Sequence, residues 1–332
     1  MVAEGAEEGM HRLALAPLGI VITWLAGLAA AAPQPLRYPD RPVEVIVAYG
    51  AGGSTDLVAR MLGQKLHERL GQPFVVINKP GGNGMIGAVA AARARPDGYT
   101  LYVGYTSETV IVPQVSHAIK YSIDDFEPIA VTGLVPLVLI VAKTVQAKTL
   151  SELVTEVSAA PGKFTFGGGI ASPPHVVGAW FNRLKGLVVT HVPYRGGGQG
   201  VTDVVGGHID MFYAGVAAAK AAIDSGAVKA LAVTGDTRSS ALPDVPTFKE
   251  AGIADLDLAS WTVLLAPKGT PATILALLRQ ESLQGLADPG LRALLAAQGV
   301  EASPTQDVAA FLARERANYG RAVRALGVTL DQ

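Results

Sequence analysis

The chain contains no cysteine, so disulfide bridges, thiolate metal ligands, cysteine nucleophiles and lipid attachment to cysteine are all excluded. This does not argue against export, because a domain with a large apolar core needs no disulfide. Aromatic residues are scarce at 6%, charged residues make up only 17%, and the formal net charge is -1. Without a basic surface or an aromatic platform for bases, nucleic-acid binding is not expected.

The sequence also lacks the common signatures of catalysis and metal binding. No H-E-x-x-H or G-x-S-x-G motif occurs, and the histidines show no metal-ligand spacing. Ser107, Ser172 and Ser260 have no identifiable histidine and aspartate partners, although a triad can be scattered along a chain. We therefore expect no catalytic residue, no metal and no cofactor.

The N-terminus carries the features of an export signal. Leu13–Ala32 is uncharged, follows Arg12, and ends in four alanines. A basic residue, an apolar stretch and a small-residue end predict a signal peptide over residues 1–32, cleaved near Ala31 or Ala32. A retained membrane anchor is the alternative, because the apolar stretch is long enough to span a bilayer. The acidic residues before Met10 fit neither a signal peptide nor a membrane anchor, and Met10 is an alternative start of translation.

The remaining chain alternates between short apolar runs and helical patterns. With 332 residues, it is long enough for two domains, and 49% apolar residues suit buried parallel strands. The first segment reads β-α-β-α-β, which predicts a parallel sheet with helical crossovers. Its expected elements are strand Val43–Tyr49, a helix from Ser54, strand Phe74–Ile77, helix Met85–Ala94 and strand Tyr99–Tyr105.

A second series of elements follows, and helices close the chain. The expected elements are helix Leu150–Ala159, strand Phe164–Phe166, helix Val176–Leu184, Val188–Val192, Gln199–Val205, Met211–Tyr213, Val216–Ile223, Val228–Val233, and helices Ala272–Leu286, Gly290–Ala297 and Thr305–Leu326. Long strands near Val131–Ala142 and Leu258–Leu265 are each expected to begin in one domain and end in the other. The predicted domains are residues 33–135 with 258–332, and an inserted domain of residues 136–257.

A glycine-rich turn separates the first expected strand from the first helix. It contains Gly52, Gly53, Ser54 and Thr55. Helix N-terminal N–H groups lack internal partners and carry partial positive charge, so this turn is a candidate anion site. The alternatives are an ordinary capped turn and a dinucleotide site. The latter is disfavoured because Thr55 stands at the third glycine position of G-x-G-x-x-G.

A second glycine-rich turn lies about 115 residues further along. Gly167, Gly168 and Gly169 follow an expected strand, and Ser172 is placed to cap the helix that Pro173 and Pro174 open. His175 lies in the first turn of this helix. It is a candidate ligand contact, with a half-exposed surface histidine as the alternative.

Several blocks together resemble the receptors of tripartite tricarboxylate transporters, also called the Bordetella uptake gene family. The resemblance extends from Tyr38 to about Val328. Each block alone is unspecific, and their order along the chain carries the resemblance. The blocks are residues 38–43, 52–56, 78–82, 96–101, 191–196, 231–234, 242–247 and 266–271.

The resemblance implies a periplasmic, two-lobed α/β fold of the type II Venus flytrap kind, with parallel-rich sheets flanked by helices. It implies a monomeric receptor that captures a small carboxylate for the membrane subunits of a transporter. The ligand contacts implied are Tyr49, Gly52, Gly53, Ser54, Thr55, Asp56, Thr106, Ser107, Gly168, Gly169, Ser172, His175, Tyr194 and Ala214.

Three departures from the family pattern bear on the ligand. The first turn reads Ala-Tyr-Gly-Ala-Gly-Gly, the second reads Gly-Gly-Gly-Ile-Ala-Ser-Pro-Pro-His, and Ala214 stands where many relatives carry aspartate. Without that carboxylate, a plain organic acid is favoured over an amino acid. Two other functions stay open: a secreted α/β hydrolase or isomerase, and a binding protein that feeds a membrane sensor.

Overall fold

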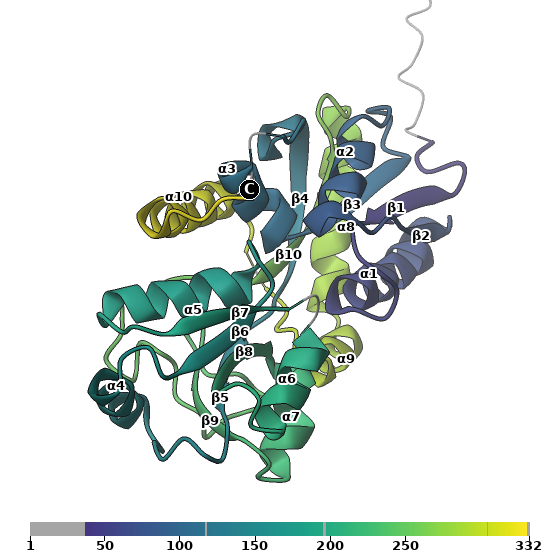
Figure 1. Ribbon diagram of the computed structural model, residues 1–332. Coiled ribbons are helices and arrows are strands. Elements are labelled where there is room, and N and C mark those ends of the chain that lie inside the picture. The colour runs from purple at the N-terminus through teal and green to yellow at the C-terminus, as the bar shows by residue number, and fades with distance from the viewer. Residues whose placement is uncertain (1–36, 117, 195–196, 304, 331–332) are drawn as a thin grey trace, which may run out of the picture. The chain divides into compact units, whose positions relative to one another are not determined.

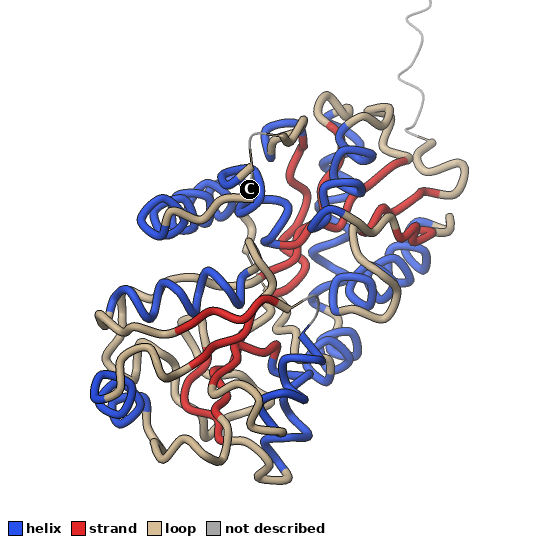
Figure 2. The backbone as a smooth tube through the Cα atoms, viewed as in Figure 1, coloured by secondary structure: helices blue, strands red, loops and turns tan. Residues whose placement is uncertain are grey.

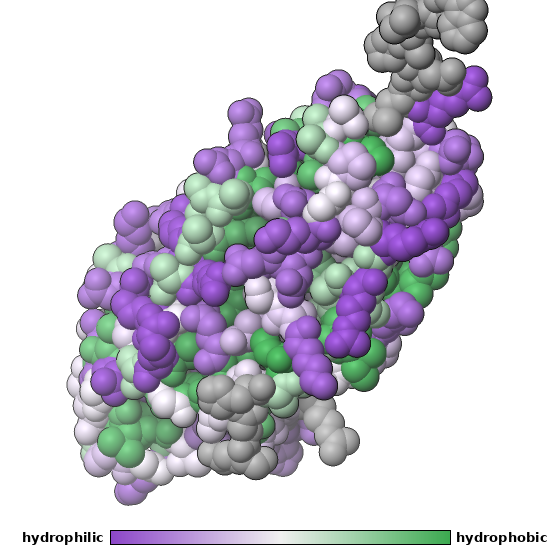
Figure 3. Space-filling view, turned by 90° about the horizontal axis from the view of Figure 1, so that it is seen from above, coloured by the Kyte–Doolittle hydropathy of each residue, from purple (hydrophilic) through white to green (hydrophobic). Residues whose placement is uncertain are grey.

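The computed structural model describes residues 37–116, 118–194, 197–303 and 305–330. Tyr38–Gln332 forms one compact unit. The predicted signal segment, residues 1–32, lies outside the described residues. Among the residues that are described, no helix is both long enough and apolar enough to cross a bilayer. Figure 3 shows one face of the molecule, on which hydrophilic side chains alternate with small hydrophobic areas.

The first sheet has five strands in the order β2-β1-β3-β10-β4 (Figure 1). β1 pairs in parallel with β2 and β3, whereas β10 runs antiparallel to β3 and β4. Helices cover both faces, which explains why the strands read as continuous apolar runs. The strands are β1 (Val43–Val47), β2 (Phe74–Asn78), β3 (Thr100–Tyr105), β4 (Phe126–Leu134) and β10 (Trp261–Pro267).

The second sheet also has five strands, in the order β7-β6-β8-β5-β9. β6 is parallel to β7 and β8, and β5 is antiparallel to β8 and β9. Figure 2 shows the strands of each sheet between helices. The strands are β5 (Leu137–Val141), β6 (Thr165–Gly168), β7 (Thr190–Pro193), β8 (Met211–Gly215) and β9 (Lys229–Val233).

The helices begin and end at residues that suit a helix terminus. Gly71 ends α1 in the left-handed conformation, with φ of 76°, and Thr149 caps α4 by accepting the Glu152 N–H at 3.2 Å. The α-helices are α1 (Ser54–Leu70), α2 (Met85–Ala92), α3 (Val112–Val115), α4 (Leu150–Ala159), α5 (Pro173–Leu184), α6 (Gly197–Val205), α7 (Val216–Asp224), α8 (Ala272–Ala287), α9 (Pro289–Ala297) and α10 (Val308–Leu326). Shorter helical turns are η1 (Gly82–Gly84), the π-helical η2 (Ser107–Ile111) and η3 (Ile123–Asp125).

Three clusters of buried apolar residues form the core. One lies on a face of the first sheet and includes Leu62 of α1 and Leu278 of α8. Another lies on a face of the second sheet and includes Val204 of α6 and Ala219 of α7. The third and largest contains residues from both sheets and from α10. This shared cluster joins the two sheets, because burying its apolar surface stabilises both together.

The predicted fold class is confirmed, since both sheets are flanked by helices, but they are mixed and not parallel-rich: each has two parallel and two antiparallel pairings. The expected long segment Val131–Ala142 divides around Pro136, so β4 lies in the first sheet and β5 in the second. The prediction for Leu258–Leu265 was wrong, because β10 lies wholly in the first sheet. The return connection, residues 234–260, contains no helix or regular strand. Prolines such as Pro243 and Pro246 disfavour regular structure in it.

Candidate functional site

The first glycine-rich turn joins β1 to α1. Gly53 is the N-cap of α1 in an extended conformation, and no side chain caps the helix. Gly52 has φ of 86°, a left-handed conformation that glycine adopts without strain. The loop glycines are exposed and Ser54 is half-buried, whereas Thr55 is buried. The first N–H groups of α1 therefore lie at an accessible turn with the Ser54 hydroxyl beside them.

Asp56 shapes this turn from inside. Its side chain is only 2% exposed, and its carboxylate accepts hydrogen bonds from the Gly52 N–H at 2.9 Å, Asn78 Nδ2 at 2.9 Å and Arg60 Nε at 3.0 Å. Although burial acts to raise the pKa of Asp56, these hydrogen bonds lower it below its ordinary value. The geometry therefore gives Asp56 a structural role in place of the direct ligand contact expected from the sequence.

The second turn joins β6 to α5. Gly167 and Gly168 lie within β6, so the turn itself is shorter than the three glycines predicted. A Cβ on Gly168 would lie 2.8 Å from the His175 backbone nitrogen, which shows how closely strand and helix approach. Ala171 has φ of 55°, an uncommon value for a residue with a side chain.

Ser172 occupies the N-cap of α5, as predicted, but its side chain does not cap the helix. The Ser172 hydroxyl oxygen is buried and has no hydrogen-bond partner among the described residues. A buried hydroxyl without a partner is costly, and a bound ligand atom would satisfy it. Both glycine-rich turns thus precede helices without a side-chain cap, but Pro173 and Pro174 leave α5 without N–H groups at its first two positions, whereas those of α1 are present.

Two stacked histidines lie beside the second turn. The ring centroids of His175 and His191 are 4.1 Å apart. His191 Nε2 lies 2.9 Å from the Gly168 carbonyl oxygen, and His175 Nδ1 accepts from the Ala171 N–H at 3.3 Å. Burial, together with the neighbouring His191, lowers the pKa of His175 to about 4, and burial also lowers the pKa of His191. Both rings are therefore neutral at pH 7.

Side chains from η1 and η2, the helical turns beside the first sheet, reach the second turn. Ser107 Oγ donates to the Ala171 carbonyl at 3.0 Å, and Asn83 Nδ2 donates to the Ile170 carbonyl at 3.3 Å. Ser107 was predicted as a site residue from the resemblance, whereas Asn83 and His191 were not. His191 begins one of the blocks that carry the resemblance, residues 191–196, which was the available signal, whereas only the folded chain brings Asn83 to this place.

Tyr49, another predicted site residue, is connected to η2 through Glu108. The Tyr49 hydroxyl donates to Glu108 Oε2 at 2.6 Å, and Glu108 directly follows Ser107 in η2. Sequence reasoning missed Glu108 entirely. The available signal was that Glu108 is the only acidic or basic residue, histidine apart, between Asp97 and Lys120.

Three further predicted residues have other partners. Thr106 is fully buried, and its hydroxyl binds both the N–H and the carbonyl of Trp261. Tyr194 lies next to the second turn, but its hydroxyl donates to Asp203 at 2.6 Å. Ala214 is 1% exposed and packs in the apolar cluster of the second sheet. None of these three side chains therefore presents a free polar group at either turn.

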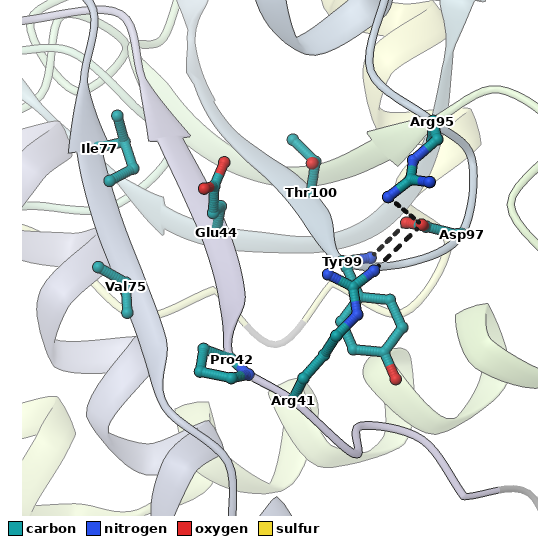
Figure 4. A pocket seen from close by; sticks show the side chains of 9 residues that line it. All are labelled: Arg41, Pro42, Glu44, Val75, Ile77, Arg95, Asp97, Tyr99 and Thr100. Atoms are coloured by element: carbon teal, nitrogen blue, oxygen red, sulfur yellow. Dashed lines mark hydrogen bonds and ion pairs between the residues drawn. The ribbon is translucent and has the colours of Figure 1, made fainter.

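Figure 4 shows a separate surface pocket of about 320 Å³ at the other end of the first sheet. Its arginines, Arg41 and Arg95, both pair with Asp97, and Arg41 lies 3.8 Å over the Tyr99 ring. None of the predicted site residues lines this pocket. Both arginines already pair with Asp97, so the two turns are the better candidate for a ligand.

The described residues show no arrangement for metal binding or for a serine nucleophile. Among them, no group of three or more metal-ligating side chains occurs. The Ser107 hydroxyl donates to a carbonyl, and the hydroxyls of Ser172 and Ser260 have no partner in the described part of the chain. What the two turns offer chemically is hydrogen-bond donation to an anion.

Comparison with known proteins finds similar sequences over most of the chain. The family model described as "Tripartite tricarboxylate transporter family receptor" matches residues 58–328. Protein BugT of Bordetella pertussis is 35% identical over 97% of this chain and 99% of its own length.

Solved structures of similar proteins cover most of the chain. MatC from Rhodopseudomonas palustris with bound malate is 30% identical, has a TM-score of 0.74, and covers 86% of this chain and 100% of its own. An R. palustris protein with adipate is 29% identical, has a TM-score of 0.77, and covers 88% of this chain and 99% of its own. The protein belongs to the receptor family of the tripartite tricarboxylate transporters, whose members are periplasmic solute-binding proteins.

Proposed function

We propose that this receptor captures a small dicarboxylate between its two glycine-rich turns and delivers it to the membrane subunits of a transporter. Two observations carry the proposal: the uncapped N-terminus of α1, and the buried Ser172 hydroxyl without a partner among the described residues at the start of α5. Ser107 of η2, which follows β3 of the first sheet, donates a hydrogen bond to Ala171 of the second turn. One carboxylate would accept the free N–H groups at the start of α1, and the other would accept the Ser172 hydroxyl at the start of α5, where Pro173 and Pro174 have no N–H to offer.

The electrostatics favour an organic acid without an ammonium group. Asp56 and Glu108, the acidic side chains nearest to the first turn, already accept several hydrogen bonds each from protein groups. Neither is free to pair with a ligand cation, and Ala214 offers no carboxylate. Malate and adipate, which bind to two relatives, are the first acids to test.

The neutral donors suit a receptor that must release its ligand. The two histidines carry no charge at pH 7, and the helix termini carry only partial charges. Affinity would then come from several hydrogen bonds and from exclusion of water on closing. We assign residues 33–135 and 258–332 to one lobe and residues 136–257 to the other, with closure about the connections between them. Closure around a ligand needs no second copy of the chain, so we propose that the protein is a monomer. We also propose that it has no catalytic activity.

The proposal is tested by calorimetry with a panel of organic acids that includes malate, adipate, a monocarboxylate and an amino acid. We expect a dicarboxylate to bind with one site per chain and to be recovered unchanged, as checked by mass spectrometry. Failure of every acid to bind would contradict the proposal. Recovery of a converted product would instead show an enzyme.

Export is part of the same proposal. Residues 1–32 would direct the chain to the periplasm, with cleavage near Ala31 or Ala32. N-terminal sequencing of the periplasmic protein should find a start near Pro33. An intact chain in the cytoplasm would contradict export.

A further inference from the structure

Glu108 is a buried acid next to the candidate site that the binding proposal does not use. Its side chain is 0% exposed. Oε2 accepts the Tyr49 hydroxyl at 2.6 Å, and Oε1 accepts the Tyr102 hydroxyl at 2.7 Å and the Tyr105 N–H at 2.6 Å. None of the ion pairs among the described residues involves Glu108. A carboxylate held only by neutral donors is sensitive to any further negative charge nearby.

The surroundings of η2 contain few groups that could exchange protons or charge with Glu108. The helices α2 and α3 and the turn η1 contain no titratable side chain. Three of the four arginines of α10 are paired, Arg314 with Glu315, Arg316 with Asp124 and Arg321 with Asp257. The remaining titratable groups on the elements around Glu108 are Tyr49, Tyr102, Tyr105, Tyr121, Glu315, Tyr319 and Arg324.

The Tyr49 hydroxyl connects Glu108 to the candidate site. Tyr49 directly precedes the first turn, and the Ser107 hydroxyl is near enough to its hydroxyl to influence its pKa. Ser107 itself contacts the second turn through Ala171. The Tyr49 hydroxyl therefore lies where the first turn and the second turn are joined.

When Glu108 is ionised, the Tyr49 hydroxyl donates its hydrogen bond to the carboxylate and cannot donate to a ligand. A protonated Glu108 would need an acceptor, and the Tyr49 oxygen can accept as well as donate. If the Glu108 O–H donates to Tyr49, the Tyr49 O–H is free to donate elsewhere. The proton that Glu108 gains comes from solvent, and the charge of the buried acid is removed in the same step.

Resting on the function proposed above, we propose that Glu108 and Tyr49 form a proton-linked part of the anion site. Binding of a carboxylate beside Tyr49 draws one proton from solvent onto Glu108, and the released Tyr49 O–H donates to the bound anion. The bound state thus gains a donor and loses a buried negative charge close to the ligand. Glu108 acts through Tyr49 and is a positioning residue.

The direction of the pH dependence follows from the linkage. Burial raises the pKa of Glu108 to about 7, while the hydrogen bonds from Tyr49, Tyr105 and Tyr102 act to lower it. A bound anion raises this pKa further. Affinity for the acid is therefore highest below the pKa of Glu108 in the free protein. It falls as pH rises from that value towards the higher pKa of Glu108 in the complex. The loss is at most about tenfold per pH unit. His175, with a pKa lowered to about 4, does not titrate in this range.

The test is calorimetry with malate, and separately with adipate, in buffers of different ionisation enthalpy at several pH values around 7. We expect the wild-type protein to take up a fraction of a proton per acid bound, and its affinity to fall above pH 7. Glu108→Gln should lose both the proton uptake and the pH dependence. Tyr49→Phe should lose the proton uptake while retaining Glu108, and it keeps the test decisive if Glu108→Gln fails to fold.

Tyr121→Phe is the matched control. The Tyr121 hydroxyl donates to the Glu108 main-chain carbonyl at 2.6 Å and not to the carboxylate. This variant removes a hydroxyl from the same cluster, and proton uptake should persist. Malate or adipate binding without proton uptake, or unchanged uptake in Tyr49→Phe, would overturn the inference and leave the proposed function standing. No binding at any pH would overturn the proposed function, and the proton coupling with it.

Discussion

At the scale of single residues, neighbours in the first turn have different tasks. Ser54 is half-buried at the start of α1, whereas Thr55 is buried. Asp56 is also buried, and its carboxylate accepts a hydrogen bond from the Gly52 N–H of the loop. The side chains that could touch a ligand are therefore fewer than those that shape the turn. Substitutions at adjacent positions should separate binding from stability.

Replacing Ser54 with alanine should weaken malate or adipate binding by about 1–3 kcal/mol, because a hydrogen bond to a charged group is lost. The melting temperature should hardly change, since Ser54 does not cap α1. Calorimetry on the folded variant measures the effect. Ser151→Ala, an exposed serine in the first turn of α4, is the matched control. Equal affinities for wild type and Ser54→Ala would place the anion elsewhere.

Replacing Asp56 with asparagine should lower the free energy of unfolding by about 1–3 kcal/mol, because an amide cannot accept all the hydrogen bonds that the carboxylate accepts. The pKa of Asp56 is lowered in the folded protein, so its stabilising effect is present above the ordinary value of 3.8. It is lost as pH falls through the lower folded pKa. Urea unfolding as a function of pH should show the difference between wild type and variant narrowing in acid. A difference that stays constant down to the lowest pH would contradict this assignment.

At the scale of elements, the junction of β6 and α5 determines the second turn. Strand and helix approach so closely that Gly168 has no room for a side chain. The same approach places the His175–His191 stack against the Gly168 carbonyl. The position of the α5 N-terminus therefore depends on backbone packing more than on the side chains of the turn.

Gly168→Ala should destabilise the protein by about 1–3 kcal/mol through overpacking, and it should weaken carboxylate binding by moving α5. Thermal unfolding and calorimetry measure the two effects. Gly215→Ala is the control, because Gly215 also ends a strand of this sheet and a Cβ there would meet nothing within 4 Å. If Gly168→Ala is as stable as Gly215→Ala, strand β6 and helix α5 can move apart without cost, and the prediction is contradicted.

At the scale of the whole molecule, the two sheets are joined by the shared apolar cluster, by α10 and by the contacts that Ser107 and Asn83 make. A ligand held by both turns binds only the folded chain. Its binding free energy therefore adds to the stability of both sheets together.

A hundredfold excess of malate or adipate over its dissociation constant should add about 2.7 kcal/mol to the free energy of unfolding. For a protein of this size, the melting temperature should rise by about 5–10 °C. Small-angle scattering should show a more compact particle with the acid, since closure is a hinge motion between lobes. A rise in melting temperature without any change in scattering would support binding and argue against closure.

The sequence by itself determined the fold class, most strands and helices, and the family. Apolar periodicity, glycine turns and the order of short blocks are local or cumulative signals, so they need no knowledge of distant contacts. The sequence also marked both turns, because a glycine-rich segment between a strand and a helix is visible locally. Its error at Leu258–Leu265 arose because apolarity reveals that a strand is buried, not which sheet it joins.

Only the tertiary structure decided which polar groups near the turns are free. Asp56 and Thr106 look like ligand contacts in the sequence, yet their oxygens bind protein groups that lie far away along the chain. Glu108 is isolated from other charged residues in the sequence, but only folding surrounds it with tyrosine hydroxyls from separate elements. Hydrogen-bond satisfaction and burial are properties of the assembled chain, and for that reason no local pattern could reveal them.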